Sequence, residues 1–266
     1  MNIKAENILH RIWGISKWLL LVLYLFITLG MVNAKKQTLP CRAIETQIID
    51  SLSVHFITEK EMTDMILNRY GKILGSPISR VVSGKIEKLI SQNPFVARAE
   101  VYKDIEGVLH LRILQRHPVA RIIRNSKPDV YLDRDGILLK SNQGKPVYVL
   151  VVSGYTRLRN NMLNKPVTSL PGNHPLQGVY RIAAFIDSTD FWKNQIEQIY
   201  INRDGEFWLT PRAGAHRIQF GNADNYKWKF RKLYLLYTYG LNNIGWNQYE
   251  TINLKYSNQV VCEKRK

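Results

Sequence analysis

The side chains that most often carry chemistry are scattered through this chain of 266 residues. No histidine pair has the His-Glu-x-x-His spacing that places two imidazoles on one side of a metal ion. Ser153 precedes Gly154, but a nucleophile elbow needs the pattern Gly-x-Ser-x-Gly. We therefore predict that the protein is not an enzyme and has no metal or cofactor. The six histidines are His10, His55, His110, His117, His174 and His216.

Three short motifs resemble ligand-binding loops only in part. Asp133-Arg134-Asp135-Gly136 begins like a calcium loop but lacks the later ligands and the final glutamate. An Asp-Gly pair between two apolar runs instead indicates a hairpin turn, and the same holds for Asp204-Gly205. The segment from Gly71 to Gly75 lacks the Gly-Lys-Ser/Thr ending of a phosphate loop. His117, which precedes Pro118, is predicted to be a linker residue between two domains.

One long apolar run, from Trp18 to Ala34, lies near the start of the chain. As a helix it would measure roughly 26 Å, close to the hydrocarbon thickness of a bilayer. We expect residues 18–34 to be a single transmembrane helix, with Lys17 reaching the headgroups. Flanking positive charges are balanced and do not orient the helix. A short tail, residues 1–17, followed by a large domain favours a cytoplasmic N-terminus.

A cleaved signal peptide is the alternative for this run, because Val32-Asn33-Ala34 fits a cleavage site. The extra apolar residues before Lys17 favour the uncleaved anchor. The net charge of +17 indicates a basic surface that is either simply solvated or attracted to anionic lipid or cell-envelope polymer. An exported domain would not meet nucleic acid. Two cysteines, Cys41 and Cys262, are too few for a disulfide framework, so we predict free, partly buried thiols.

Two domains are expected after the apolar run. The first has a strand, two helices and two strands, and its first helix begins with a Thr58 to Glu61 capping box. The second is mostly strand-like, with helices near Ile182 and Phe230. The overall class is α+β: a transmembrane helix, a β-α-α-β-β module and a mostly antiparallel β-domain with flanking helices. A terminal strand is expected from Tyr249 to Val261.

Several motifs, in order along the chain, resemble the FtsQ/DivIB family of bacterial division proteins. Gln115 and Phe95 stand where the family usually has glutamate and tryptophan, and Asn253 and Lys255 stand for aspartate and arginine. The motifs are Ile90 to Tyr102, Leu109 to Ile113, Arg116 to Arg121, Tyr131 to Gly136, Trp228 to Leu233 and Ile252 to Tyr256.

The resemblance implies that residues 43–116 form a POTRA domain and residues 117–262 a β-domain with a partner-binding C-terminal edge strand. It also implies a single-pass protein of the bacterial inner membrane, located at the division septum, with its soluble domains in the periplasm. Its function would be that of a non-enzymatic scaffold that links early and late division proteins. The implied partners are coiled-coil proteins of the FtsB and FtsL type, bound by the C-terminal strand. Other division proteins would bind the POTRA domain and the transmembrane helix.

Strand addition is the expected binding mode, because an exposed edge strand offers unpaired amides and carbonyls to a partner segment. The alternative for the aromatic residue in this group is that Tyr256 packs in the core. The residues carried over from the family motif are Lys255, Tyr256, Asn258, Gln259 and Val260.

Three other classes of protein are alternatives. An outer-membrane assembly factor with a POTRA domain would also need a large barrel, and no such run of strands fits the remaining length. A secreted or periplasmic POTRA-containing envelope protein, or an exported enzyme, would follow from cleavage at Ala34. A mature chain that starts at Lys35 would favour either of these.

Overall fold

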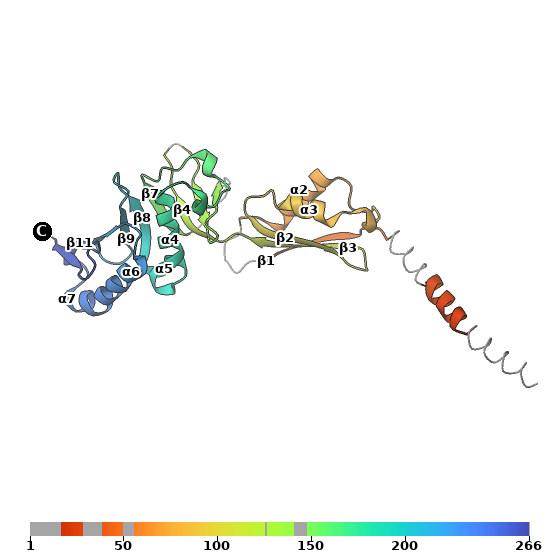
Figure 1. The fold of residues 1–266 in the computed structure, drawn as a ribbon. Helices are drawn as coiled ribbons and strands as arrows, with labels where there is room; N and C mark the ends of the chain where they lie inside the picture. The colour runs from red at the N-terminus through yellow and green to blue at the C-terminus, as the bar shows by residue number, and fades with distance from the viewer. Residues whose placement is uncertain (1–16, 29–38, 50–55, 126, 141–147, 266) are drawn as a thin grey trace, which may run out of the picture. The chain divides into compact units, whose positions relative to one another are not determined.

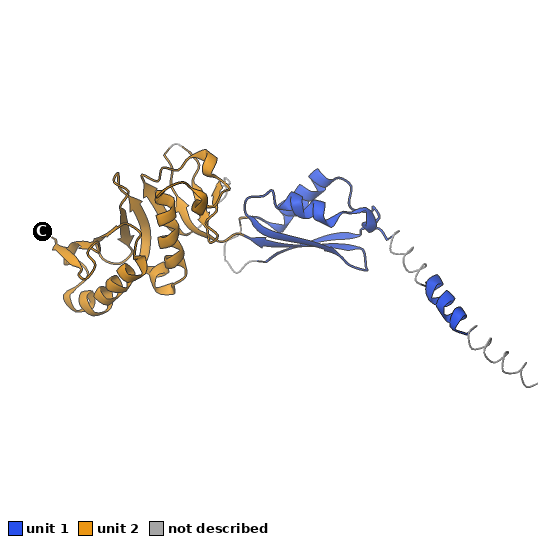
Figure 2. Ribbon diagram, in the orientation of Figure 1, with its two compact units in different colours: residues 1–51, 57–115 blue, residues 52–56, 116–266 orange. Residues whose placement is uncertain are grey.

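The computed structural model describes residues 17–28, 39–49, 56–125, 127–140 and 148–265. The chain divides into two compact units, which Figure 2 colours separately. Unit 1 contains residues 1–51 and 57–115, and unit 2 contains residues 52–56 and 116–266. Each unit has its own sheet (Figure 1).

Unit 1 has the predicted β-α-α-β-β order. Its three strands are arranged β1-β3-β2, with β1 parallel and β2 antiparallel to the central strand β3. The two helices α2 and α3 lie on one face of this sheet (Figure 1). The elements are β1 (Ala43–Ile49), α2 (Glu59–Tyr70), the 3-10 turn η1 (Ile78–Arg80), α3 (Ser83–Ile90), β2 (Val96–Lys103) and β3 (Val108–Gln115).

The first helix of unit 1 begins where the capping box predicts. The Thr58 hydroxyl oxygen accepts from the Glu61 amide at 3.2 Å, and the Glu61 carboxylate accepts from the Thr58 amide at 3.0 Å. Both groups satisfy amides that a helix start leaves unpaired. Met62 and Ile66 are buried on the side of α2 that faces the sheet, where Leu111 is also buried.

The apolar run near the start is described only in part. A helix covers residues 17–28. Within the residues that the structure describes, no helix is both long enough and apolar enough to cross a membrane. Residues 29–34 of the expected span lie outside the described residues.

Unit 2 is built on a mixed sheet. Over the described residues its nine strands follow the order β12-β11-β10-β9-β8-β7-β4-β5-β6. Five neighbouring pairs are antiparallel and three are parallel. The strands are β4 (Pro118–Ile122), β5 (Val130–Asp133), β6 (Leu138–Lys140), β7 (Leu150–Gly154), β8 (Ile196–Ile201), β9 (Phe207–Pro211), β10 (Arg217–Gly221), β11 (Tyr249–Asn253) and β12 (Val261–Lys264).

The sheet is mostly antiparallel, as predicted, but it also contains three parallel pairs that the sequence did not indicate. Helices connect β7 to β8, and a helical segment connects β10 to β11. Such crossover connections let the two strands of each pair run parallel. β4 and β7 are parallel because the hairpin partners β5 and β6 are inserted between them in sequence. The helical elements of unit 2 are η2 (Asn160–Met162), η3 (Val167–Ser169), α4 (Pro175–Asp187), α5 (Asp190–Gln195), α6 (Tyr226–Leu235), the π-helical segment η4 (Leu236–Leu241) and α7 (Asn242–Ile244).

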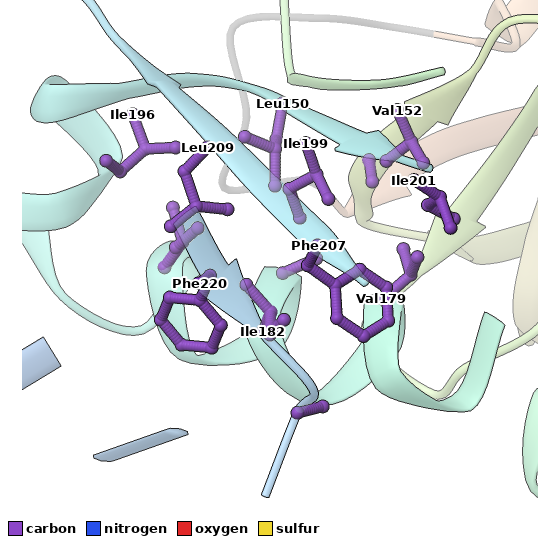
Figure 3. Packing of buried hydrophobic residues seen from close by; sticks show 14 of the residues in the cluster. Leu150, Val152, Val179, Ile182, Ile196, Ile199, Ile201, Phe207, Leu209 and Phe220 are labelled. Carbon is purple, nitrogen blue, oxygen red and sulfur yellow. The ribbon is translucent and has the colours of Figure 1, made fainter. Parts of the chain in front are cut away.

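The core of unit 2 lies between the sheet and helix α4. Val179 and Ile182 of α4 face alternate residues of the sheet, including Ile199, Leu209 and Phe220 (Figure 3). All five side chains are fully buried. Side chains alternate between the two faces of a strand and recur about every 3.6 residues along a helix. Each element therefore has one apolar face, and these faces pack against each other.

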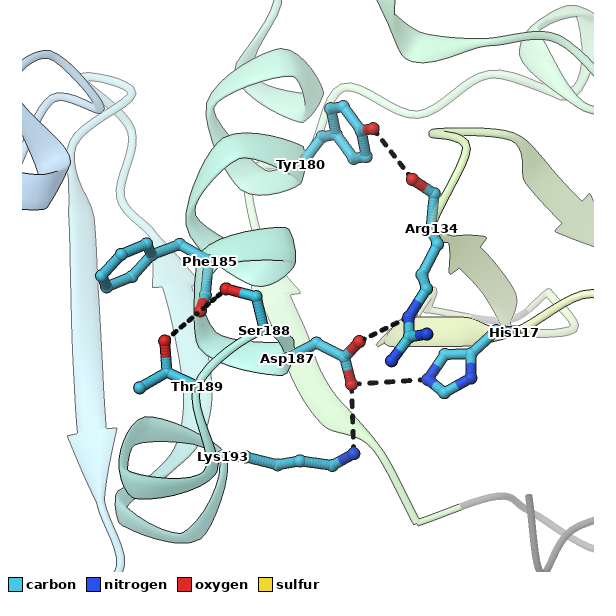
Figure 4. Close-up of polar contacts among 8 residues, drawn as sticks. All are labelled: His117, Arg134, Tyr180, Phe185, Asp187, Ser188, Thr189 and Lys193. Atoms are coloured by element: carbon cyan, nitrogen blue, oxygen red, sulfur yellow. Dashed lines mark hydrogen bonds and ion pairs between the residues drawn. The ribbon is translucent and has the colours of Figure 1, made fainter. Parts of the chain in front are cut away.

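Helix α4 is tied to the rest of unit 2 by a cluster of charges at its C-terminal end. Asp187 accepts from Arg134 at 2.8 Å and pairs with Lys193 at 3.2 Å and His117 at 3.4 Å (Figure 4). Burial alone would raise the pKa of the Asp187 carboxyl, but the hydrogen bonds from Arg134 and Lys193 outweigh burial and hold its pKa below the ordinary value. His117 lies between β3 and β4, just after the boundary of the two units as predicted, and its contact with Asp187 also ties it to unit 2.

Candidate partner-binding edge

The sheet of unit 2 ends in two strands where the sequence indicated one. β11 ends at Asn253, and β12 starts at Val261 and returns antiparallel beside it. Pairing of Asn253 with Val261 closes a loop over residues 254–260. The predicted terminal strand from Tyr249 to Val261 is therefore wrong in its extent, because the alternation of residue types cannot show that the chain turns back.

All five residues predicted to bind a partner lie in this loop. The side chains of Lys255, Tyr256, Asn258 and Gln259 are exposed, whereas Val260 is half-buried against the core. Tyr256 is 50% exposed, so it does not pack in the core. The structure thus places the predicted residues in one loop, directly before the edge strand.

Helix α6 holds the loop in place through Lys232 and Trp228. The Lys232 ammonium donates to the backbone carbonyl oxygens of Leu254 at 3.4 Å, of Gln259 at 3.3 Å and of Tyr256. Burial lowers the pKa of Lys232. The Trp228 indole donates to the carbonyl oxygen of Ser257 at 2.9 Å. The ammonium group thus donates to three carbonyl oxygens of the loop, in place of the backbone amides that would pair with them in a sheet.

Sequence reasoning missed the contacts of Lys232 and Trp228 with the loop. Lys229 lies three residues before Lys232, on the same side of α6; both lysines are 8% exposed, but Lys229 binds the end of β10 instead of the loop. The Lys229 ammonium donates to the carbonyl oxygens of Phe220 at 3.0 Å and Asn222 at 2.8 Å. The available signal in the sequence was a pair of lysines three residues apart on a helix rich in aromatic residues.

Lys255 already has a partner within unit 2. Its ammonium lies 2.5 Å from the Glu206 carboxylate, and this hydrogen bond raises the pKa of Lys255. The Lys255 amide also donates to the Asn253 side chain at 2.9 Å. Lys255 therefore helps to fix the start of the loop.

The two edges of the nine-stranded sheet differ. At the β6 edge, residues from the following loop cover the backbone: the Asn164 amide donates to the Leu138 carbonyl at 2.7 Å, and the Val167 amide donates to the Gly136 carbonyl at 2.8 Å. At the other edge, the described residues place no strand beyond β12. The ladder is therefore covered at one edge and open at the other.

The backbone groups that face the open side can be assigned from one hydrogen bond. The Arg265 amide donates inward to the Gln248 carbonyl at 3.0 Å. Because backbone groups alternate along a strand, the Glu263 amide also faces β11, whereas the amides of Cys262 and Lys264 face the open edge. The Cys262 side chain packs against the core, and burial raises the pKa of its thiol.

The described residues contain no group of three or more histidine, cysteine, aspartate or glutamate side chains that could hold a metal ion. Cys41 and Cys262 are both free. Burial raises the pKa of Cys41 as well, and a thiol with a raised pKa is a weak nucleophile at neutral pH.

Comparison with known proteins agrees with this architecture. Residues 117–263 match the family described as FtsQ/DivIB, C-terminal related, and residues 39–114 match the POTRA-like domain. The cell division protein FtsQ of Geotalea daltonii is 26% identical over 181 residues, which cover 67% of this chain and 62% of that protein. The match thus spans less than two thirds of the relative's length. Since the first match covers more than half of the sequence, the chain belongs to the FtsQ/DivIB-related family of cell division proteins.

Proposed function

We propose that this protein is a non-enzymatic scaffold of the bacterial division machinery. Residues 18–34 anchor it in the inner membrane, residues 1–17 form a cytoplasmic tail, and the POTRA domain and the β-domain lie in the periplasm at the septum. Coiled-coil proteins of the FtsB and FtsL type bind at the C-terminal end, and other division proteins bind the POTRA domain and the transmembrane helix. The family match and the open edge at β12 support this proposal.

The open edge at β12 is the observation that carries the binding mode. A partner segment in extended conformation can pair with the outward backbone groups of Cys262 and Lys264 and become a tenth strand. Tyr256 is exposed in the loop that leads into this edge strand and offers a large aromatic contact, a residue type common among binding hot spots. The loop over residues 254–260 and β12 together form the proposed binding surface.

A four-residue edge strand with charged side chains can also be a device that prevents edge-to-edge association. A proline in place of a residue whose amide faces outward from β12 distinguishes partner binding from protection against edge-to-edge association. Proline removes one outward donor and places its ring in the path of a partner strand, but it leaves the inward ladder to β11 intact.

The test uses the full chain in detergent with its coiled-coil partner and measures co-purification and affinity. We expect Lys264→Pro to abolish binding without lowering the melting temperature. Lys264→Ala, which keeps the amide and removes the same charge, should bind normally. Normal binding of Lys264→Pro would remove strand addition from the proposal. Glu263→Pro, which removes an inward amide, should lower the melting temperature and so shows whether β12 pairs with β11 as described.

The membrane anchor is tested separately. After an alkaline wash of membranes, the intact chain should remain in the pellet. Recovery of a soluble chain that begins at Lys35 would show cleavage after Ala34, and the secreted or periplasmic alternatives would replace the anchored scaffold.

A further inference from the structure

Basic residues gather at one end of the mixed sheet, away from any part of the chain assigned a role so far. Strands β4, β7 and β8 are neighbours and parallel, so their carboxyl ends lie at the same edge of the sheet. Each of the three loops that leave this edge carries at least one cation. Arg124 and Lys127 follow β4, Arg157 follows β7, and Arg203 follows β8.

The loop after β7 is held against the end of β8. The Tyr155 amide donates to the Ile201 carbonyl at 2.9 Å. Gly154 has φ +89°, and a Cβ there would lie 2.2 Å from the Ile201 carbonyl oxygen, so only glycine fits. Arg203 donates to the Tyr155 hydroxyl at 2.7 Å and lies over its ring. These contacts fix the position of the residues that follow.

A groove of about 530 Å³ opens between the loops after β4 and β7. Arg124, Lys127 and Arg157 line it together with Tyr155 and three small polar residues, and no carboxylate is among the described lining residues. The nearest acidic side chain along the chain, Asp129, is paired with Arg121 at 2.5 Å. The positive charge of the groove is therefore not neutralised by its own walls. The small polar residues are Asn125, Ser153 and Thr156.

The three cations of the groove are held differently. Arg124 donates to the Pro128 carbonyl oxygen at 2.7 Å and to the Asn160 side chain at 2.9 Å, both neutral acceptors, so its position is fixed while its charge remains. Lys127 and Arg157 are exposed and form no ion pair within the described part of the chain. The groove thus has one fixed cation and two that can turn toward a ligand.

Arg157 has an unusual backbone. Its φ is +52°, and the other described non-glycine residues with positive φ are both asparagines. Asparagine tolerates this left-handed region, whereas a long side chain such as arginine rarely occupies it. Such strain persists where surrounding contacts or a function require it. A glycine would fit here without strain, so the choice of arginine indicates a use for its guanidinium group.

We propose that this groove binds a multiply charged phosphate group, such as a diphosphate or a phosphorylated headgroup. Three cations without a carboxylate match an anion of charge two or more better than a single carboxylate. The planar guanidinium forks of Arg124 and Arg157 suit phosphate oxygens, and the ammonium of Lys127 adds a point charge. The groove is large enough for a headgroup, and Tyr155 in its lining is 44% exposed.

The experiment measures pyrophosphate binding by the full chain in detergent, by calorimetry at low ionic strength. We expect Lys127→Gln combined with Arg157→Gln to weaken binding by about tenfold or more, because two charged contacts are lost. The matched control combines Arg80→Gln and Lys85→Gln, two exposed cations of unit 1, and removes the same charge from another surface. Its affinity should change little.

Single substitutions at Arg157 separate binding from folding. Arg157→Gly should keep or raise the melting temperature, because glycine accepts φ +52°, yet it should weaken pyrophosphate binding. Arg157→Lys should retain most of the binding, because it retains the charge. No binding by the unaltered chain, or an equal loss in the double variant and its control, would overturn the proposal.

Two sources of the phosphate can be distinguished in nanodiscs. The full chain is placed in phosphatidylcholine discs with and without phosphatidic acid, and the pyrophosphate titration is repeated. Weaker apparent binding in discs with phosphatidic acid, dependent on Arg157, assigns the groove to a lipid headgroup. Equal binding in both discs assigns it to a soluble phosphate compound.

Discussion

The ammonium group of Lys232 lies 3.3 Å from the carbonyl oxygen of Gln259, and this contact joins helix α6 to the loop before the edge strand. The same ammonium serves two further carbonyls of that loop. The loop that presents Tyr256 is therefore held by a side chain from another element, and its geometry depends on α6.

Replacement of Lys232 by methionine should release this loop. Three carbonyl oxygens would lose their donor at a site that water reaches poorly, and we expect a loss of about 1–3 kcal/mol in the stability of unit 2. Partner affinity should fall as well, because Tyr256 would no longer be held. Lys227→Met changes an exposed lysine of the same helix and should have little effect. Tryptophan fluorescence is a suitable readout, because Trp192, Trp208, Trp228 and Trp246, four of the six tryptophans, lie in unit 2.

Arg116 and Asp133 provide a second prediction. The Asp133 carboxylate is 1% exposed, accepts from Arg116 at 2.8 Å and accepts from the Ile137 amide at 2.6 Å. Burial raises the pKa of Asp133, against the hydrogen bonds that lower it. Arg116→Ala would leave a buried carboxylate without its cation and should cost about 3 kcal/mol.

Asp133→Asn should be milder than Arg116→Ala. The amide oxygen can still accept from Ile137, no buried charge remains, and Arg116 is exposed enough to be solvated. Urea unfolding of both variants would check the order. A larger loss for Asp133→Asn would show that the ion pair itself, rather than the removal of an unpaired charge, stabilises this turn.

Tyr256→Ala distinguishes a binding residue from a structural one. Because the side chain is half-exposed, the melting temperature should change little, whereas the partner should bind about 2 kcal/mol more weakly or worse. Tyr239→Ala removes another exposed tyrosine, 68% exposed on η4, and serves as the control. Unchanged affinity in a folded Tyr256→Ala protein would exclude this residue from the interface.

The pH dependence of stability should report on Asp187. Its pKa is lower in the folded state than in the unfolded state, so the folded state binds fewer protons and gains stability above the unfolded pKa. This stability is lost as the pH falls through the lowered folded pKa. Asp187→Asn should therefore lower the melting temperature of unit 2 at pH 7, and the difference from the unaltered chain should shrink under strongly acidic conditions. A difference that is the same at both pH values would mean that the charge of Asp187 does not stabilise the fold.

Local features of unit 1 could be predicted from the sequence because their causes lie within a few residues. The Thr58 and Glu61 capping box acts over three positions, and the apolar residues of α2 recur at helical spacing. The residues that the family motif predicts to bind a partner lie near the end of the chain, in a loop rather than in the strand that the motif implied. Each of these signals is short-range, or is carried by the order of the motifs.

The pairing of strands in unit 2 depended on the tertiary structure. Whether β10 lies beside β11 in parallel, and whether β12 returns to become the edge, depends on which arrangement buries the apolar faces of the sheet and of α4 together. A strand shows the same alternation of apolar and polar residues whether its neighbour is parallel or antiparallel. The contacts of Lys232 with the loop and of Asp187 with His117 join residues that are 22 or more positions apart. Only the folded chain brings such residues within hydrogen-bonding distance, and no local pattern encodes which partner a buried charge will find.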